Sequence, residues 1–142
     1  IAAGGIADGR GVAAAFMLGA EAVQMGTRFV ASKEAVVHEN YKEQILKAKD
    51  IDSVITGAST GHPVRSLRNH MTREYLQLEK DNADFMELEK LTLGSLRKAV
   101  VEGDAVNGTL MAGQIAGLIQ EEKSCKEIIE EIMAQAEELI HG

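Results

Sequence analysis

The chain has few of the residues that mark several common classes of protein. It contains one cysteine, Cys125, one proline and no tryptophan. A single cysteine excludes an internal disulfide, and its acidic surroundings without a nearby histidine argue against a catalytic thiol. The sequence also lacks an apolar run of the roughly 20 residues that a membrane span requires. It shows no signal-peptide pattern either, and we expect a cytoplasmic protein without membrane attachment.

Basic residues are also scarce, because the chain has 15 Lys+Arg against 22 Asp+Glu and a formal net charge of -7. This balance argues against nucleic acid as a main partner, since a phosphate backbone needs a basic face. It does not exclude a small phosphate ligand, which backbone amides and a helix dipole can hold. With 142 residues the chain is too short for a closed (β/α)8 barrel, which typically needs about 250.

Two glycine turns near the start of the chain each follow a short apolar strand. Residues 1–3 end at Gly4 and Gly5, and a second short strand, over 22–25, ends at Gly26. A helix of small residues over 12–20, with Asp8 as its N-cap, connects the two strands. This spacing predicts a βαβ crossover with adjacent parallel strands.

The paired turns predict a phosphate site. Glycine lets the backbone approach a ligand closely and adopt positive φ, and adjacent parallel strands bring Gly4 and Gly5 close to Gly26 and Thr27. In (β/α)8 barrels the loops after the last two strands commonly bind phosphate. Ordinary βα turns are the alternative interpretation, but the occurrence of two such turns one βαβ unit apart favours phosphate binding.

Beyond the second turn the pattern alternates between helices and one extended region. We predict helices over 42–49, 72–82, 84–101, 110–119 and 125–140, and strands over 53–56 and 64–67. We accordingly divide the chain into three parts. Residues 1–50 form a last βαβ unit of a barrel with the phosphate site, 51–70 form an extended or loop insertion, and 71–142 form a C-terminal helical region.

The histidines and the basic residues offer a weaker indication of function. No two histidines have the spacing of a helical metal site, and we expect no metal. His62 lies with Arg65 and Arg68 in the only locally basic stretch. We interpret this stretch as a solvated basic loop that helps the chain to turn. Contact with a cofactor phosphate or with an acidic carrier protein is the alternative.

Four segments together resemble a known family. AAGGIADGRG and LGAEAVQMGTRF at the start of the chain are similar to the nitronate monooxygenase and FMN-dependent enoyl-ACP reductase II family. GHPVRSLRN (61–69) and NGTLMAGQIAGLI (107–119) resemble the enoyl-ACP reductase II branch more closely. Inosine monophosphate dehydrogenases share a similar glycine turn, but MGTRF and GHPVR do not look like their segments.

The resemblance implies an α/β fold, namely the C-terminal portion of a (β/α)8 TIM barrel with its last two strands, followed by a mostly helical C-terminal extension. It also implies FMN at the carboxyl ends of the strands. The implied cofactor-binding residues are Gly4, Gly5, Met25, Gly26 and Thr27, through their backbone, and Gln24, near the ribityl chain or the phosphate edge.

The implied activity is the reduction of a 2-enoyl thioester, carried by acyl carrier protein or coenzyme A, in bacterial fatty-acid synthesis. NAD(P)H would reduce the flavin, which would deliver hydride to the β-carbon. The catalytic histidine of the family would lie upstream of Ile1, so we expect no catalytic residue in this chain and no activity from the chain alone. A nitronate monooxygenase using FMN and oxygen, and a non-catalytic helical association module, are the alternatives.

The strand pair also indicates that the chain needs a partner polypeptide. Two parallel strands alone leave unpaired edges and a bare apolar face. The chain opens at Ile1 in an apolar strand end and without an initial methionine. We therefore expect a missing N-terminal barrel portion, supplied by another polypeptide, or self-association as a homodimer.

Overall fold

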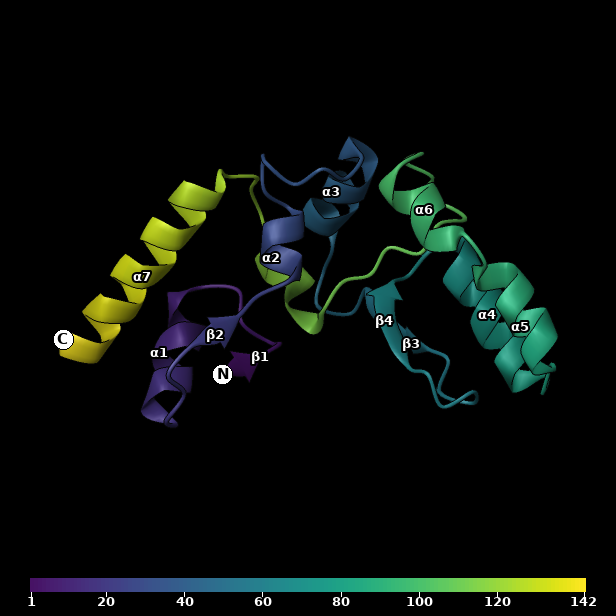
Figure 1. Cartoon of the computed structure of the whole chain (residues 1–142), viewed down its shortest axis with the longest axis horizontal. Helices are drawn as coiled ribbons and strands as arrows, with labels where there is room; N and C mark the ends of the chain where they lie inside the picture. Colours follow the sequence, from purple (N-terminus) through teal and green to yellow (C-terminus); the bar gives the residue numbers. More distant parts are fainter.

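A short parallel strand pair and a separate antiparallel hairpin lie in different halves of an elongated arch (Figure 1). The computed structural model describes residues 1–142. In chain order the elements are β1 (Ala2–Ala3), α1 (Gly9–Met17), β2 (Val23–Gln24), α2 (Thr27–Val30), α3 (Glu39–Lys47), β3 (Ser53–Thr56), β4 (Val64–Leu67), α4 (His70–Lys80), α5 (Phe85–Thr92), α6 (Ser95–Val100), the 3-10 helix η1 (Gln114–Leu118) and α7 (Cys125–His141).

The first unit is the predicted βαβ crossover. Strands β1 and β2 pair in parallel, with Ala3 opposite Gln24, and α1 connects them. The Asp8 carboxylate accepts hydrogen bonds from the backbone N–H groups of Arg10 and Gly11. It therefore satisfies two of the donors that a helix start leaves unpaired, which confirms the predicted N-cap.

Helix α7 packs along α1, although more than a hundred residues separate them in sequence (Figure 1). One face of α7 is buried against α1 in a cluster that comprises Ile6, Val12, Ala13, Ala15, Ile128, Ile132 and Ala136. The two helices meet at Gly9, where an added Cβ would lie 2.5 Å from the carbonyl oxygen of Ile132. The last helix of the chain thus covers the helix that connects its first two strands.

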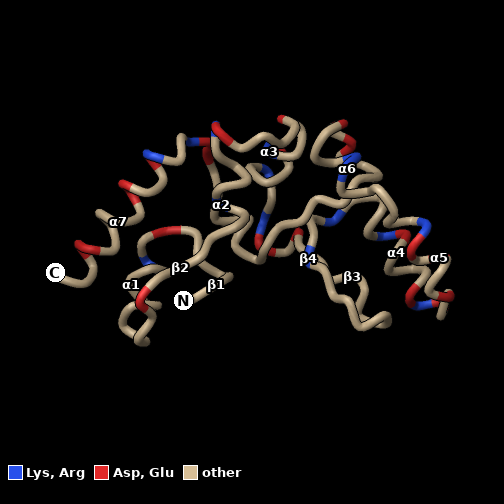
Figure 2. The backbone as a smooth tube through the Cα atoms, in the orientation of Figure 1, with Lys and Arg blue, Asp and Glu red and all other residues tan.

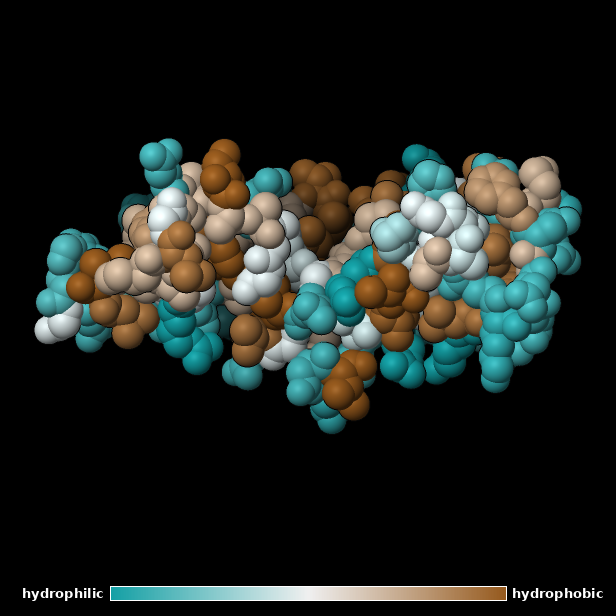
Figure 3. Space-filling model, turned by 90° about the horizontal axis from the view of Figure 1, so that it is seen from below, coloured by the Kyte–Doolittle hydropathy of each residue, from teal (hydrophilic) through white to brown (hydrophobic).

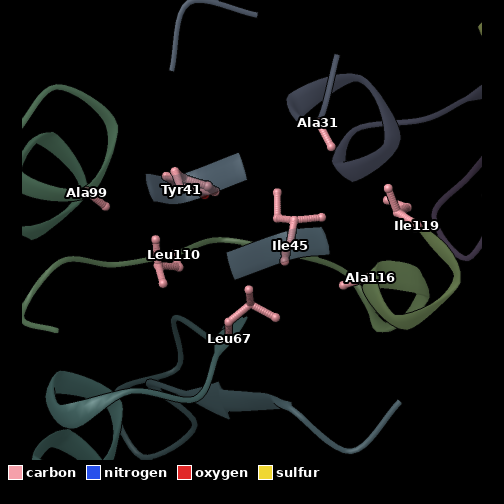
Figure 4. Close-up of a cluster of buried hydrophobic side chains, with 9 residues drawn as sticks. Ala31, Tyr41, Ile45, Leu67, Ala99, Leu110, Ala116 and Ile119 are labelled. Carbon is pink, nitrogen blue, oxygen red and sulfur yellow. The ribbon is translucent and has the colours of Figure 1, made fainter. Parts of the chain in front are cut away.

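A second cluster forms the middle of the arch. Figure 4 shows that its side chains converge from α2, α3, β4, α6 and the segment that ends in η1. The buried members are Ala31, Tyr41, Ile45, Leu67, Ala99, Leu110, Ala112, Ala116 and Ile119. Helix α3 begins three residues before the predicted start, and Ile45 at its centre is fully buried.

The far end of the arch holds the hairpin and three helices. Strands β3 and β4 are antiparallel, with Ser53 opposite Leu67 and Thr56 opposite Val64, which confirms the two predicted strands. A small third cluster of Met71, Tyr75 and Leu88 joins α4 to α5.

Two predicted helices are wrong in extent. The predicted helix over 84–101 is divided into α5 and α6, because Gly94 adopts φ +74°, a left-handed conformation that ends a helix. The predicted helix over 110–119 is helical only in η1. Met111 instead forms an antiparallel bridge with Ser66, and Leu67 donates its N–H to the Leu110 carbonyl at 2.8 Å.

The surface shows no single dominant feature. Acidic residues recur along α7, whereas basic segments lie beside β4 in the middle of the arch (Figure 2). Seen from below, apolar residues form several separate patches among hydrophilic ones (Figure 3). No helix of the structure combines the length and the apolar composition needed to cross a membrane.

Candidate functional site

The parallel register brings the two glycine turns together. Ala3 lies opposite Gln24, so Gly4 and Gly5 leave β1 beside the point where Met25 and Gly26 leave β2. Neighbouring strands lie about 4.8 Å apart. Both turns therefore present their backbone at one edge of the βαβ unit.

The backbone N–H groups at these turns are available to a ligand. Gly4 and Gly5 have φ values of +86° and +72°, which a residue with a Cβ adopts only at a cost. The N–H groups of Gly4, Gly5 and Gly26 donate no hydrogen bond to the backbone of the chain. No atom lies within 4 Å of an ideal Cβ placed on any of the three, so the turns offer both donors and open space.

Thr27 fastens the second turn to a distant part of the chain. It begins α2, for which Gly26 is the N-cap residue. Its Oγ1 accepts a hydrogen bond from the backbone N–H of Gly113 at 2.9 Å. The Thr27 hydroxyl still has a proton to donate. The segment that precedes η1 is thereby held beside the turn.

Met25 and Gln24 occupy different environments. The half-buried Met25 packs against the cluster shared by α1 and α7, so only its main chain is free for a ligand. Gln24 is exposed at the end of β2 and its side chain makes no hydrogen bond within the chain. Its amide is therefore free to approach a bound molecule.

Arg28 is the buried residue of α2, directly after the second turn. This side chain is only 8% exposed, and its Nη1 donates to the Glu121 carbonyl at 3.3 Å. Burial lowers the pKa of the Arg28 guanidinium, while the charges of Glu121 and Glu131 act in the opposite direction. Arg28 thus links the second turn to the segment that leads into α7.

A groove of about 300 Å³ connects the second turn to β4. Its lining consists of Gly26, Thr27, Val30, Arg65, Met111, Ala112 and Gly113. Arg65 lies on β4, within the predicted strand over 64–67, and its half-buried side chain lines this groove instead of an open solvated loop.

The other two basic residues of that stretch are not part of the groove. Arg68 is exposed, and His62 lines a separate pocket that also contains Tyr75. Of the three basic residues, Arg65 alone lines the groove beside the second turn, and the local concentration of positive charge was its only signal in the sequence. No cluster of three or more histidine, cysteine or carboxylate side chains with metal-binding geometry occurs.

Comparison with known proteins relates this geometry to a family. The family model described as nitronate monooxygenase matches residues 1–135. A probable nitronate monooxygenase of Staphylococcus saprophyticus is 36% identical over 141 residues, which are 99% of this chain and 39% of the relative. Its counterpart in Staphylococcus aureus strain Newman is 43% identical over 115 residues, which are 80% of this chain and 32% of the relative.

Solved structures show the same relationship. FabK from Thermotoga maritima superposes with a TM-score of 0.93 at 57% identity, covering 98% of this chain and 44% of that one. Nitroalkane oxidase from Streptomyces ansochromogenes superposes with a TM-score of 0.74 at 30% identity, covering 96% of this chain and 38% of that one.

The chain spans less than half the length of each of these relatives. The matches confirm the predicted fold class, an α/β portion of a (β/α)8 barrel joined to a mainly helical region. The named relatives include monooxygenases and an oxidase, so the family is one of oxidoreductases. With its family model matched over residues 1–135, the chain belongs to the nitronate monooxygenase family.

Proposed function

We propose that this chain holds the phosphate of FMN in an oxidoreductase that reduces 2-enoyl thioesters. The observation that carries the proposal is the pair of glycine turns at the ends of two paired strands, with free N–H groups and open space. A phosphate monoester accepts several such hydrogen bonds at once, and this is how loops after barrel strands bind phosphate.

The residues of the chain bind and orient the cofactor in this proposal. Gly4 and Gly5 donate from the first turn, Gly26 and Thr27 donate from the second, and the Gln24 amide contacts the ribityl chain. Met25 contributes its main chain only. When bound, FMN supplies the hydride chemistry, taking hydride from NAD(P)H and delivering it to the β-carbon of the enoyl thioester.

No histidine lines the groove. We propose that the catalytic histidine and the strands that support the flavin ring belong to the other part of the barrel, since the chain spans less than half the length of its relatives. The chain alone is then inactive. The complete enzyme would act as a homodimer in the cytoplasm on an acyl carrier protein or coenzyme A thioester.

Two activities fit this cofactor site, and the sequence favours one of them. GHPVRSLRN and NGTLMAGQIAGLI resemble the enoyl-ACP reductase II branch. The chain is 57% identical to FabK, but only 36% identical to the probable nitronate monooxygenase of Staphylococcus saprophyticus and 30% identical to nitroalkane oxidase. Nitronate monooxygenase is the second candidate, because the family model that matches the chain carries that description.

The cofactor part of the proposal is tested by substituting Gly26. Its backbone is not left-handed and nothing lies near an added Cβ, so Gly26→Ala should fold normally. The new methyl group would occupy the space proposed for phosphate and should weaken FMN binding, measured by quenching of flavin fluorescence. Gly11→Ala, in the adjoining helix, is the matched control. Equal affinity for FMN in the two variants would contradict the placement of the phosphate.

The reaction is tested with the complete barrel. Consumption of NAD(P)H that depends on an added 2-enoyl thioester is the expected result. Oxygen uptake with an alkyl nitronate, without any requirement for NAD(P)H, would instead establish nitronate monooxygenase. A colourless protein that cannot be reconstituted with FMN would refute both.

A further inference from the structure

We propose that Arg65, which the β3–β4 hairpin carries, is a further ligand for the phosphate held at the Gly26 turn. The hairpin would then be part of the cofactor site rather than a separate surface feature. This inference rests on the proposed function, because it takes its ligand from there. From the sequence, contact of the basic stretch around Arg65 with a cofactor phosphate was only the alternative to a solvated loop.

The first argument is location. Arg65 lines the same groove as Gly26 and Thr27, although it lies almost forty positions further along the chain. Its side chain is half-buried there, and the floor beside it is formed by Met111 and Ala112. A guanidinium at the edge of a mainly apolar groove is more weakly screened by water than one on an open surface.

The second argument is rigidity. The Arg65 carbonyl accepts a hydrogen bond from the N–H of Ala112 at 3.3 Å, and the residue that follows Ala112 is Gly113. Gly113 donates its own N–H to Thr27 Oγ1 at 2.9 Å. Two consecutive residues therefore connect the strand that carries Arg65 to the proposed phosphate turn. The backbone of Arg65 is therefore fixed relative to the turn before any ligand arrives.

The third argument is the unused bonding capacity of Arg65. Its Nη1 donates to Oγ of Ser53, on the facing strand β3, at 3.0 Å. No carboxylate lies within 4.0 Å of it, whereas Arg10 and Arg97 each have one. Because a guanidinium carries five N–H donors, most of them remain free. Ser53 orients the group without neutralising it, which suits a planar fork that binds phosphate through two hydrogen bonds.

The test compares three probes: inorganic phosphate, FMN, and riboflavin, which lacks the phosphate. Affinities are measured by calorimetry for the wild-type chain and for Arg65→Gln, Arg65→Lys and Arg68→Gln. Arg68 is the matched control because it is a nearby exposed arginine outside the groove. In parallel, the ¹⁵Nε resonance of Arg65 is followed by nuclear magnetic resonance during each titration.

We expect Arg65→Gln to weaken FMN binding by about tenfold or more, the loss typical of a hydrogen bond to a charged group. Arg65→Lys should recover part of the affinity, and Arg68→Gln should change it less than about twofold. Riboflavin should bind all variants alike. The Arg65 resonance should move with FMN and with phosphate but not with riboflavin. Arg65→Lys keeps the charge and the side-chain length, so it maintains the test if Arg65→Gln fails to fold.

The outcomes separate this inference from the proposed function. If FMN binds and Arg65→Gln behaves like Arg68→Gln, the inference is overturned while the flavin function stands. If FMN binds no better than inorganic phosphate but both shift the Arg65 resonance, the anion site stands and the flavin function fails. If no probe shifts the Arg65 resonance, the inference is overturned.

Discussion

The backbone N–H of Gly9 donates a hydrogen bond to Oε1 of Gln135 at 2.8 Å, although 126 positions separate the two residues. The bond lies where the first turn of α1 meets α7. An added Cβ on Gly9 would lie 2.6 Å from Cβ of Gln135 and 2.7 Å from the N atom of Ala136. The close approach of the two helices therefore depends on the absence of a side chain at this position.

Gly9→Ala should destabilise the protein for this reason. Forcing a methyl group into a filled helix contact typically costs about 1–3 kcal/mol, which exceeds the gain of up to about 1 kcal/mol expected from replacing glycine by alanine in a helix. Gly11→Ala is the control, because the atom nearest to its added Cβ would be Cγ2 of Ile6, at 3.2 Å. Urea denaturation should show a lower midpoint for Gly9→Ala alone, and equal midpoints would contradict the packing.

Ile45→Ala should be among the most damaging substitutions in the middle of the arch. Ile45 is fully buried in the second cluster, and truncation of such a residue typically costs about 2–5 kcal/mol through lost burial and the remaining cavity. Ile51→Ala, at a position that is 72% exposed, should cost little. The free energies of unfolding of both variants provide the comparison, and similar losses would show that the cluster does not support the fold.

Thr27→Val should loosen the connection between the second turn and the segment before η1. Valine has the shape of threonine but cannot accept the N–H of Gly113, and a lost hydrogen bond of this kind costs about 1 kcal/mol. Thr27→Ser keeps the acceptor and should remain close to the wild type. Hydrogen exchange at Gly113, measured by nuclear magnetic resonance, should accelerate in the valine variant only. Unchanged exchange would mean that the bond is not maintained in solution.

The start of α7 should depend on pH. Glu127 accepts hydrogen bonds from the hydroxyl and the backbone N–H of Ser124, and these bonds lower the pKa of Glu127 from 4.5 to about 2. Since the pKa is lower in the folded state, the stabilisation is complete above 4.5 and is lost as the pH falls towards 2.

The difference in unfolding free energy between the wild type and Glu127→Ala should therefore be constant near neutral pH and narrow below pH 4.5. Glu137→Ala, on an exposed position of α7 without an ion pair, serves as the control and should show no such narrowing. Urea denaturation across the acidic range makes the measurement. A difference independent of pH would contradict the capping role of the carboxylate.

Local sequence patterns were sufficient to predict the elements that depend only on neighbouring residues. The small-residue helix with its Asp8 cap, the β-branched hairpin strands and the amphipathic stripe of α7 each follow from a few neighbouring residues. The glycine turns were identified for the same reason, since their spacing is that of one βαβ unit.

Features with a long-range cause were not predictable in this way. The apolar pattern over 84–101 fits one continuous helix, and only the left-handed conformation of Gly94 reveals the break. Residues 110–112 have helical composition but are extended, because Met111 pairs with Ser66. The position of Arg65 depends on that same pairing, so no local pattern could have placed it beside Gly26. The division of the chain into three parts, and the cofactor contacts themselves, remain predictions.

Ser32 forms a parallel bridge with Lys123, and Lys33 donates its N–H to the Lys123 carbonyl at 3.0 Å. The stretch from 33 to 123 therefore leaves the strand–helix unit and returns beside the point where it left, and insertions whose ends lie close together are commonly tolerated. Evolution can lengthen, shorten or reshape such an excursion while the first two strands and the final helix keep their register.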